Sequence, residues 1–430
     1  MERVELARLL RVRSADGIVA EARDGVVVEE REPGRFREAF AEAVAAGGTV
    51  FLANPDWGAA ERSQFNVLVQ SKIHTEAGRP TSDNPNSQIS HGWLCIPTGG
   101  SAGRIKLARH DQDTLHAAVR GFCTHFGVAR VNAVGVLPLH HVGGLMGWLR
   151  AELTRGSFLA CEWKKLEASF AEAPGANPAG RPDPTKFAEG CFLSLVPTQL
   201  QRLLAWPAAV VWLRGFRAVL VGGGPAWAEL AEAGARAGLP LAFTYGATET
   251  AAAVAALRPE EFRGGGRGCG TALPHGQITV GEAGEILVEA ESLFRGYWPD
   301  WRTVGAWRTG DRGFFDERGS LHVTGRHDTL IITGGEKVEP NEVEAVLRAT
   351  GEFADVAVIG VPDPQWGEVV IACYPAGGRV PDPARVAAGL ETLAMWKRPK
   401  RLVAVPETAW PRDASGKIDR ATLRRAQRAR

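Results

Sequence analysis

The sequence lacks the patterns that mark secreted, membrane-spanning or zinc-dependent proteins. Its six cysteines stand singly, with no C-x-x-C pair, and its ten histidines form no H-E-x-x-H motif. Isolated cysteines favour reduced thiols over disulfides or a zinc site. No apolar run reaches the ~18 residues of a membrane span, and the first residues lack the basic-then-apolar pattern of a signal peptide. A cytoplasmic protein without membrane insertion is therefore expected.

Neither sign of charge is in excess. Fifty basic residues against 49 acidic ones give a net charge of +1, which does not favour nucleic acid as a partner. The G-x-x-x-x-G-K-[ST] pattern of a Walker A loop and the G-x-G-x-x-G fingerprint of dinucleotide-binding folds are also missing. With 430 residues, 45% of them hydrophobic and 23% charged, the chain predicts a globular protein of two or more domains.

Strand–turn–helix units recur through the middle of the chain. Apolar runs that end in glycines, hydroxyls or histidines occupy residues 93–97, 134–139, 192–197, 217–221 and 239–243. This alternation predicts a layered, mostly parallel α/β domain. After residue 264, short strands with turns predict an antiparallel region, and the last hundred residues predict a small α+β unit. The alanine-rich run 250–257 is interpreted as helical.

A glycine-rich loop follows the first of these strands. Its glycines, hydroxyls and lysine are Thr98, Gly99, Gly100, Ser101, Gly103 and Lys106. Converging backbone N–H groups, hydroxyls and an ammonium group are what a phosphate cradle needs. A flexible surface loop without a ligand explains the same residues equally well.

A second loop, Tyr245-Gly246-Ala247-Thr248-Glu249, follows the strand at 239–243. It lies at the edge where open α/β sheets bind ligands. It offers an aromatic face, a flexible glycine, a hydroxyl and a carboxylate, so stacking, phosphate contact and metal binding are all open to it. Read alone, it is more often a capped turn.

Other candidate groups each have an ordinary alternative. The pair His140-His141 ends a strand, where it contacts a ligand or packs in the core. Asp311 is either a turn former or an acceptor for ribose hydroxyls, with Arg326 beside it. Arg202 is a carboxylate binder or a surface residue of its helix, and Lys417 is a mobile cation or a surface lysine.

These stretches run in a fixed order that resembles the adenylate-forming superfamily of acyl-CoA synthetases, adenylation domains and luciferases. The matching blocks are residues 98–106, 140–141, 222–225, 245–249, 309–311, 325–328 and 415–417. Within the superfamily the chain looks like the o-succinylbenzoate–CoA ligases of menaquinone or phylloquinone synthesis. The short part before the glycine-rich loop, the form of that loop and the stretch 194–200 followed by Arg202 carry this narrower resemblance.

The resemblance implies an α/β fold in two parts. A large N-terminal domain (1–327) holds layered α/β sheets and a small antiparallel region, and a small mobile α+β domain (328–430) follows a hinge at Asp328. It also implies ATP-dependent conversion of o-succinylbenzoate to an acyl-adenylate with release of pyrophosphate, then transfer to CoA with release of AMP. Mg²⁺ is expected with ATP, and the family adds a homodimer as an expectation. The alternatives are another acyl- or aryl-CoA ligase, an adenylation enzyme that loads a carrier protein, and a non-catalytic binding protein.

The resemblance also assigns roles. The implied ATP- and AMP-binding residues are Thr98, Gly99, Gly100, Ser101, Gly103, Lys106, Gly222, Gly223, Gly224, Tyr245, Gly246, Thr248, Asp311, Arg326 and Lys417. The implied catalytic residues are Lys417, which bridges the acid and the α-phosphate, Thr248 at that phosphate, and Glu249, which coordinates Mg²⁺. Arg202 and His141 are implied to bind the acid. The implied CoA-binding residues are Gly334, Gly335 and Lys337.

Overall fold

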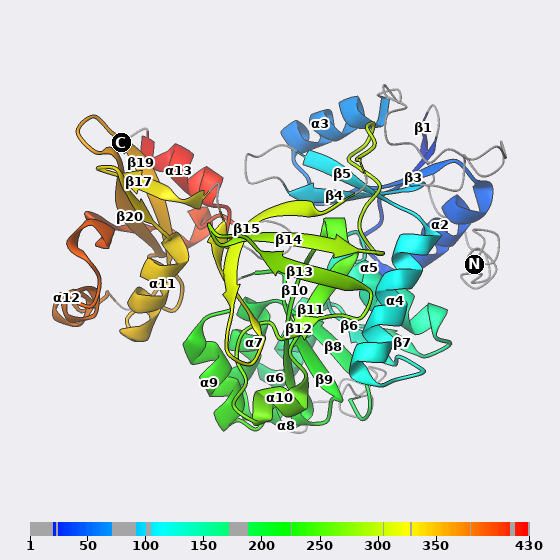
Figure 1. The fold of residues 1–430 in the computed structure, drawn as a ribbon, viewed down its shortest axis with the longest axis horizontal. Helices are drawn as coiled ribbons and strands as arrows, with labels where there is room; N and C mark the ends of the chain where they lie inside the picture. Colours follow the sequence, from blue (N-terminus) through cyan, green and yellow to red (C-terminus); the bar gives the residue numbers. More distant parts are fainter. Residues whose placement is uncertain are drawn as a thin grey trace.

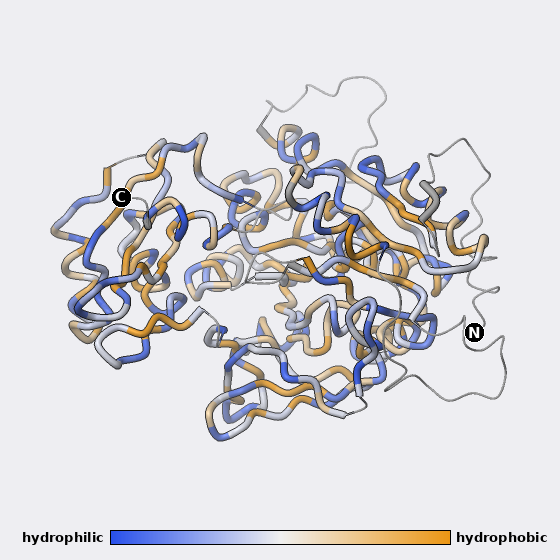
Figure 2. The backbone as a smooth tube through the Cα atoms, turned by 90° about the horizontal axis from the view of Figure 1, so that it is seen from above, coloured by the Kyte–Doolittle hydropathy of each residue, from blue (hydrophilic) through white to orange (hydrophobic). Residues whose placement is uncertain are grey.

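The structure is a computed structural model that describes residues 20–22, 25–70, 92–99, 105–171, 188–224, 226–303, 305–326, 329–378, 380–412 and 418–428. A main body carries three sheets, and a smaller C-terminal part with its own sheet lies beside it (Figure 1). Hydrophobic stretches run through both parts in Figure 2. None of the helices in these ranges has both the length and the hydrophobicity to cross a membrane.

The first sheet has five strands in the order β1-β2-β3-β4-β5. Their bounds are β1 Ala20–Ala22, β2 Gly25–Val28, β3 Thr49–Leu52, β4 Leu94–Gly99 and β5 Ile105–His110. β5 runs antiparallel to β4, and Thr98 lies opposite Lys106 in their register. The predicted phosphate loop therefore joins two paired strands, which hold its two ends side by side.

The second sheet has seven strands in the order β12-β11-β10-β9-β8-β6-β7. Their bounds are β6 Ala133–Gly135, β7 Phe158–Ala160, β8 Phe192–Leu195, β9 Ala218–Val221, β10 Leu241–Ala247, β11 Ala252–Ala256 and β12 Thr271–Ala272. The strands from β7 to β10 are parallel. The mostly parallel α/β domain predicted from the strand–turn–helix units is confirmed.

The helical interpretation of the run 250–257 is wrong. Its alanines form strand β11, which pairs antiparallel with β10 on one side and β12 on the other. Val254, Ala255 and Ala256 are fully buried there, and β11 contacts helices α4 and α5. Small side chains let those helices approach the sheet, so tertiary packing overrides the helix propensity of alanine.

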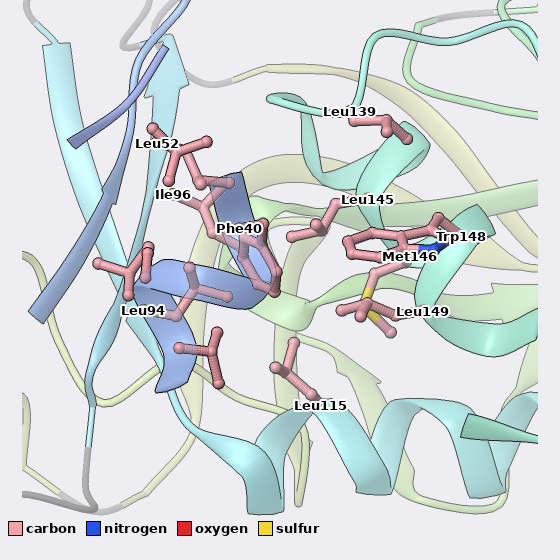
Figure 3. Packing of buried hydrophobic residues seen from close by; sticks show 14 of the residues in the cluster. Phe40, Leu52, Leu94, Ile96, Leu115, Leu139, Leu145, Met146, Trp148 and Leu149 are labelled. Carbon is pink, nitrogen blue, oxygen red and sulfur yellow. The ribbon is translucent and has the colours of Figure 1, made fainter. Parts of the chain in front are cut away.

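The helices of the main body are α2 Pro33–Ala46, α3 Ala59–Gln70, α4 Gln112–Phe126, α5 Val142–Leu153, α6 Trp163–Ala171, α7 Pro197–Leu204, α8 Pro207–Arg214, α9 Ala228–Arg236 and α10 Pro259–Arg263. α4 begins after Asp111, whose carboxylate accepts the backbone N–H of Thr114 at 3.0 Å, a standard N-cap. α5 lies in the core: Figure 3 shows its side chains Leu145, Trp148 and Leu149 gathered with residues of α2, β4 and α4.

The third sheet is an antiparallel meander in the order β13-β14-β15-β16. Its strands are β13 Gly276–Val280, β14 Glu285–Ala290, β15 Trp307–Phe315 and β16 Leu321–Arg326. The short strands predicted after residue 264 are thereby confirmed as an antiparallel region. In the β15–β16 register Asp311 lies opposite Arg326.

The C-terminal part is a small α+β unit, as predicted. Its elements are β17 Ile331–Thr333, β18 Glu336–Val338, α11 Pro340–Ala349, β19 Ala357–Asp363, β20 Gly367–Pro375, α12 Pro383–Leu390, β21 Arg401–Val405 and α13 Arg420–Arg428. Its buried clusters begin at Ile331, whereas the buried residues of the main-body clusters end at Leu321. The predicted boundary and the hinge at Asp328 lie outside the described residues and stay predictions.

Candidate active site

The loop after β10 lies where the three sheets of the main body meet. β10 ends in the short 3-10 turn η2 (Thr248–Thr250), and η2 contacts the hairpin strands β4 and β5. Tyr245, near the end of β10, reaches β15 of the third sheet by a hydrogen bond. Groups far apart in the sequence therefore surround one loop at the carboxyl edge of the parallel sheet.

Tyr245, Asp311 and Arg326 form one hydrogen-bonded cluster. The Tyr245 hydroxyl donates to Asp311 Oδ2 at 2.8 Å, and Arg326 Nη1 donates to Asp311 Oδ1 at 2.9 Å. The hydroxyl of Thr309 accepts the Asp311 N–H at 3.0 Å. Burial and the neighbouring Asp311 carboxylate raise the pKa of Tyr245 above its usual range, so its hydroxyl remains a donor. The carboxylate is held in one orientation between two donors.

Glu249, Tyr297 and Lys106 form a second cluster on the other side of the loop. Glu249 is 6% exposed, and the Tyr297 hydroxyl donates to its Oε1 at 2.6 Å. The Lys106 ammonium lies 4.8 Å from the centroid of the Tyr297 ring, within the range of a cation–π contact. Burial and the Glu249 charge raise the pKa of Tyr297 above its usual range. The base of the predicted phosphate loop thus adjoins the predicted metal ligand through Tyr297.

Backbone pairing with β5 fixes the position of Tyr297. The Arg295 N–H donates to the Arg109 carbonyl at 2.7 Å, and the Trp298 N–H donates to the Leu107 carbonyl at 2.8 Å. Tyr297 itself forms an antiparallel bridge with β5. The segment 294–298 therefore behaves as an added strand on the hairpin that carries Lys106.

His110, the last residue of β5, contacts the η2 loop through its ring. Its Nε2 lies 2.8 Å from the Thr248 carbonyl oxygen, and its Nδ1 lies 3.1 Å from the Thr114 hydroxyl. Because a carbonyl only accepts, Nε2 carries the proton. Burial lowers the pKa of His110 to about 4, so the ring is neutral at pH 7. The neutral His110 ring therefore links β5 to η2 through its hydrogen bond to the Thr248 carbonyl.

The backbone beyond Glu249 is strained and tightly held. Ala251 and Ala252 have φ angles of 51° and 74°, in the left-handed region that residues with a Cβ seldom adopt. The Thr250 hydroxyl donates to the Ala252 carbonyl at 2.6 Å, and the Ser292 hydroxyl donates to the Thr250 carbonyl at 3.0 Å. These bonds keep the direction of the chain that presents Glu249.

Two of the predicted nucleotide-binding glycines are required by close packing. A Cβ at Gly222, directly after β9, would collide with the Thr244 hydroxyl, and a Cβ at Gly246 would collide with the Ala252 carbonyl. The turn 222–224 therefore lies against β10 just before Tyr245. The structure brings this turn and the predicted adenine-binding tyrosine together, while their contact with a nucleotide stays a prediction.

The two predicted acid-binding residues lie on other elements than the two clusters. Arg202 lies on α7, where its Nη1 is 3.5 Å from Glu167 Oε1 and its side chain is 47% exposed. His141 is the residue before α5, and its ring lies 4.5 Å from that of His140. Among the described residues no hydrogen bond or ion pair joins Arg202 to the η2 loop, and its ionic partner is Glu167. Both roles stay predictions.

The predicted CoA loop is a tight hairpin turn between β17 and β18. Gly334 and Gly335 have φ angles of 57° and 86°, and two successive residues with positive φ strongly favour glycine. Lys337 is exposed on β18. Binding of CoA by this turn and Lys337 stays a prediction. Binding of the nucleotide by Gly100, Ser101, Gly103 and Lys417, which lie outside the described residues, also stays a prediction.

Tyr297 and His110 were missed from the sequence. Tyr297 stands in a run of arginine, glycine and aromatic residues between strands, which has the look of a loop. Its partner Glu249 is 48 residues earlier in the chain, and the two meet because segment 294–298 pairs with β5 while η2 contacts the same strand. His110 offered no local signal beyond its place at a strand end.

Glu249 fits a magnesium site in which the nucleotide supplies most of the ligands. Among the described residues no cluster of three or more histidines, cysteines or acidic residues is arranged around a metal. At sites that bind nucleotide phosphates, Mg²⁺ is commonly held by one or two carboxylates together with the phosphates of the substrate. Glu249 Oε1 accepts a hydrogen bond from Tyr297, and its other oxygen accepts none from the described residues.

Solved structures share the fold. The structure of o-succinylbenzoate CoA synthetase (MenE) from Bacillus subtilis in complex with the acyl-adenylate intermediate OSB-AMP superposes with a TM-score of 0.73 at 22% identity, over 92% of this chain and 87% of that one. ATP-bound MatB from Rhodopseudomonas palustris gives a TM-score of 0.72 at 23% identity, over 99% and 91%. At these identities the likeness shows the fold, which is that of the adenylate-forming enzymes.

Protein-family models define the family. The model described as AMP-binding enzyme matches residues 6–298, and the model described as AMP-binding enzyme C-terminal domain matches residues 342–417. The chain belongs to the AMP-binding enzyme family, and the resemblance to the adenylate-forming superfamily is confirmed.

Curated relatives narrow the comparison. Indoleacetate–CoA ligase of Aromatoleum aromaticum is 32% identical over 354 residues, which are 77% of this chain and 66% of that protein. 2-Succinylbenzoate–CoA ligase of Geobacillus kaustophilus is 33% identical over 353 residues, 78% of this chain and 64% of that protein. The chain thus matches slightly less than two thirds of the length of these relatives. Several further relatives are 2-succinylbenzoate–CoA ligases, so the narrower resemblance is confirmed as well.

Proposed function

We propose that the chain is an AMP-forming acid–thiol ligase that converts o-succinylbenzoate to its CoA thioester through an acyl-adenylate, in menaquinone or phylloquinone synthesis. The observation that carries the proposal is the convergence of two polar clusters on the loop after β10. One cluster joins Tyr245 to Asp311, and the other joins Glu249 to Tyr297. The 2-succinylbenzoate–CoA ligases among the relatives support the choice of acid.

Each cluster would bind a different part of the nucleotide. Asp311, oriented by Tyr245 and Arg326, would accept hydrogen bonds from the ribose hydroxyls, and the Tyr245 ring would lie against the base. The hairpin of β4 and β5 would hold the β- and γ-phosphates through its backbone N–H groups and Lys106. Mg²⁺, held by Glu249 and the phosphates, would neutralise charge on the triphosphate.

Catalysis of the first step is a problem of bringing two anions together. The carboxylate of the acid attacks the α-phosphorus, and pyrophosphate leaves. Positioning and charge neutralisation lower this barrier, and Lys417 would bridge the carboxylate and the α-phosphate while Thr248 contacts the same phosphate. In the second step the CoA thiolate attacks the acyl carbon and AMP leaves.

Movement of the C-terminal part would separate the two steps. Rotation about Asp328 would withdraw Lys417 and bring the Gly334-Gly335 turn and Lys337 to the loop, where they would admit the pantetheine arm of CoA. Only a few residues need to absorb such a change. The Arg312–Glu339 ion pair, with 3.0 Å between Nη1 and Oε1, joins β15 to the start of α11 in the present arrangement.

A second candidate has a specific observation in its favour. The indoleacetate–CoA ligase from Aromatoleum aromaticum is 32% identical, and its acid has one carboxylate instead of two. An aryl-CoA ligase for a monocarboxylic acid is therefore the alternative to be tested directly.

Acid-dependent exchange of pyrophosphate into ATP separates these functions. The purified chain is incubated with ATP, Mg²⁺, labelled pyrophosphate and one acid from a panel of o-succinylbenzoate, indoleacetate, benzoate and malonate. We expect the fastest exchange with o-succinylbenzoate, and o-succinylbenzoyl-CoA as the product once CoA is added. Exchange with indoleacetate alone would favour the second candidate. Exchange without any CoA thioester would indicate loading of a carrier protein, and no exchange with any acid would contradict the proposal.

A further inference from the structure

Two carboxylates of the C-terminal part bind the flanks of the segment that carries Lys417. Before Lys417 in the sequence, Arg412 forms an ion pair with Asp355, and the Trp410 indole N–H donates to the same carboxylate at 3.0 Å. Arg412 also forms an antiparallel backbone bridge with Ile418. The residues on either side of this segment are therefore attached to each other and to Asp355.

The second carboxylate, Glu344 of α11, binds the start of α13. Arg420 Nη2 lies 2.7 Å from Glu344 Oε1 and 2.8 Å from Oε2, and Arg420 stands three residues after Lys417. The Glu344 side chain is 0% exposed, and the Val358 backbone N–H donates to its Oε1 at 2.8 Å. Burying a carboxylate is costly unless opposite charges and hydrogen bonds compensate. Glu344 is therefore held in one orientation, and Arg420 with it.

Arg348, one turn further along α11, connects Glu344 to the main body. Its Nη2 lies 3.5 Å from Glu344 Oε2 and donates to the Val356 carbonyl at 2.9 Å. Its guanidinium carbon lies 4.9 Å from the centroid of the Trp227 ring, and Trp227 directly precedes α9 of the main body. The Arg348 side chain is 13% exposed. The contact between the two parts is therefore largely shielded from water, which strengthens a cation–π interaction.

A second contact joins the two parts beside Asp355. Gln201 of α7 donates from Nε2 to the carbonyl of Ala354 at 3.2 Å, and Ala354 is the residue before Asp355. α7 contacts α9, so Gln201 and Trp227 belong to neighbouring elements of the main body. Each of these two side chains therefore contacts the C-terminal part directly beside one of the two carboxylates that bind the flanks of Lys417.

The direction of α13 brings these flanks to the side of the C-terminal part that faces the main body. In Figure 1, α13 (red) runs from that side toward the C-terminus of the chain on the far side. Arg420 is the first residue of α13, so it lies at the end near the main body. The arrangement therefore suits the step in which Lys417 would contact the acid and the α-phosphate.

We propose that Trp227 and Gln201 are positioning residues for adenylate formation. They hold the C-terminal part in the arrangement in which the segment carrying Lys417 faces the η2 loop, and each acts through the carboxylate beside its contact. The two connections are Trp227–Arg348–Glu344–Arg420 and Gln201–Ala354–Asp355–Arg412. The proposal rests on the proposed function, because it takes Lys417 as the group that bridges the acid and the α-phosphate.

The two contacts favour the first step over the second. When the C-terminal part rotates for transfer to CoA, Arg348 leaves the Trp227 ring and Ala354 leaves Gln201. A contact present in only one of two arrangements shifts their populations by at most its own free energy. Removal of either contact should therefore slow adenylate formation and leave the transfer step unchanged or faster.

Substitutions at Trp227 and Gln201 separate positioning from folding. Trp227 packs against the main-body core, so Trp227→Leu keeps apolar bulk there and removes the π face, whereas Trp227→Phe keeps a ring. Gln201→Met removes the amide donor from a side chain of similar length. The matched control is Trp206→Leu, because Trp206 is 37% exposed and directly precedes another helix of the main body, α8.

Two assays report the half-reactions separately. Exchange of pyrophosphate into ATP, with o-succinylbenzoate as the acid, gives kcat and the KM for ATP in the first step. Conversion of supplied o-succinylbenzoyl-adenylate to the CoA thioester gives the rate of the second step. If another acid of the panel exchanges fastest in the wild type, that acid and its adenylate are used instead.

We expect kcat for exchange to fall about 5–30-fold in Trp227→Leu, the loss that a shielded cation–π contact can cause. It should fall about 2–10-fold in Gln201→Met, as for one hydrogen bond, and stay within about threefold of wild type in Trp227→Phe, which keeps a ring facing Arg348. The KM for ATP should stay within about twofold, because the nucleotide contacts are untouched. The rate with supplied adenylate should equal or exceed that of the wild type, and Trp206→Leu should change neither rate by more than about twofold.

Each other outcome counts against a definite claim. Equal losses in both half-reactions in Trp227→Leu would show a structural role and overturn the proposal, as would unchanged exchange in that variant or an equal loss in Trp206→Leu. If Trp227→Leu does not fold, Gln201→Met decides, and unchanged exchange in that variant would overturn the proposal. No exchange by the wild type with any acid would refute the ligase function itself, whereas normal exchange by the wild type together with any of the results above would refute the positioning role alone.

Discussion

Replacement of Tyr297 by phenylalanine isolates one hydrogen bond of the candidate site. The change removes the hydroxyl that donates to Glu249 Oε1 at 2.6 Å and keeps the ring over which the Lys106 ammonium lies. A hydrogen bond to a charged group contributes about 1.5–3 kcal/mol, and loss of a group that orients a metal ligand costs about 10–100-fold in metal affinity or activity. We expect kcat/KM for ATP to fall within that range, with partial recovery at higher Mg²⁺ concentration.

The chain offers a matched control for this experiment. It has three tyrosines, and Tyr374 packs edge-on against Phe353 in the C-terminal part, with 5.4 Å between ring centroids. Tyr374→Phe should leave the rate of ATP–pyrophosphate exchange within about twofold of wild type, as expected of a change away from the site. If Tyr297→Phe also stays within that limit, or if both variants lose activity equally, Tyr297 does not orient Glu249 for catalysis.

Three further predictions concern the ribose-binding aspartate, the adenylation step and the buried histidines. Asp311→Asn should raise KM for ATP by about 10–100-fold, because it replaces the charged acceptor of two hydrogen bonds, and an unchanged KM would exclude a role at the ribose. Lys417→Ala should abolish adenylate formation but spare conversion of a supplied acyl-adenylate to the CoA thioester, whereas loss of both steps would count against its role. Burial lowers the pKa of His110 and His275 to about 4 and that of His140 to about 3, from 6.5. The unfolded chain therefore takes up protons first on acidification, so the unfolding temperature should be highest above pH 6.5 and fall as the pH decreases toward 4. An unfolding temperature that does not change over this window would show that these histidines do not contribute.

The fold was largely predictable because its strands have a local sequence pattern, an apolar run that ends in a turn. The apolar runs ending in glycine turns at 217–221 and 239–243 became β9 and β10, and their alternation with helices specifies a parallel sheet. The alanine run 250–257 was mistaken for a helix because alanine favours helices in isolation, and only the helices packed on β11 make small strand residues necessary.

The site was predictable only in part, for a physical reason. Tyr245 and Asp311 were both found from their motifs, and the structure joins them directly at 2.8 Å. Tyr297 and His110 were not found, since their partners lie elsewhere in the chain. A tyrosine in a loop and a histidine at a strand end have no distinguishing local pattern. What distinguishes them is the buried Glu249 carboxylate 2.6 Å from the Tyr297 hydroxyl and the Thr248 carbonyl oxygen 2.8 Å from His110 Nε2.

Isotope transfer from the acid to AMP tests the central claim most directly. The chain is incubated with ATP, Mg²⁺, CoA and o-succinylbenzoate labelled with ¹⁸O in both carboxylates, and AMP and pyrophosphate are analysed by mass spectrometry. Attack of the carboxylate on the α-phosphorus leaves one acid oxygen on the phosphate of AMP when CoA releases it. We expect one ¹⁸O atom in AMP and none in pyrophosphate. Unlabelled AMP, or label in pyrophosphate or inorganic phosphate, would contradict an acyl-adenylate formed at this site.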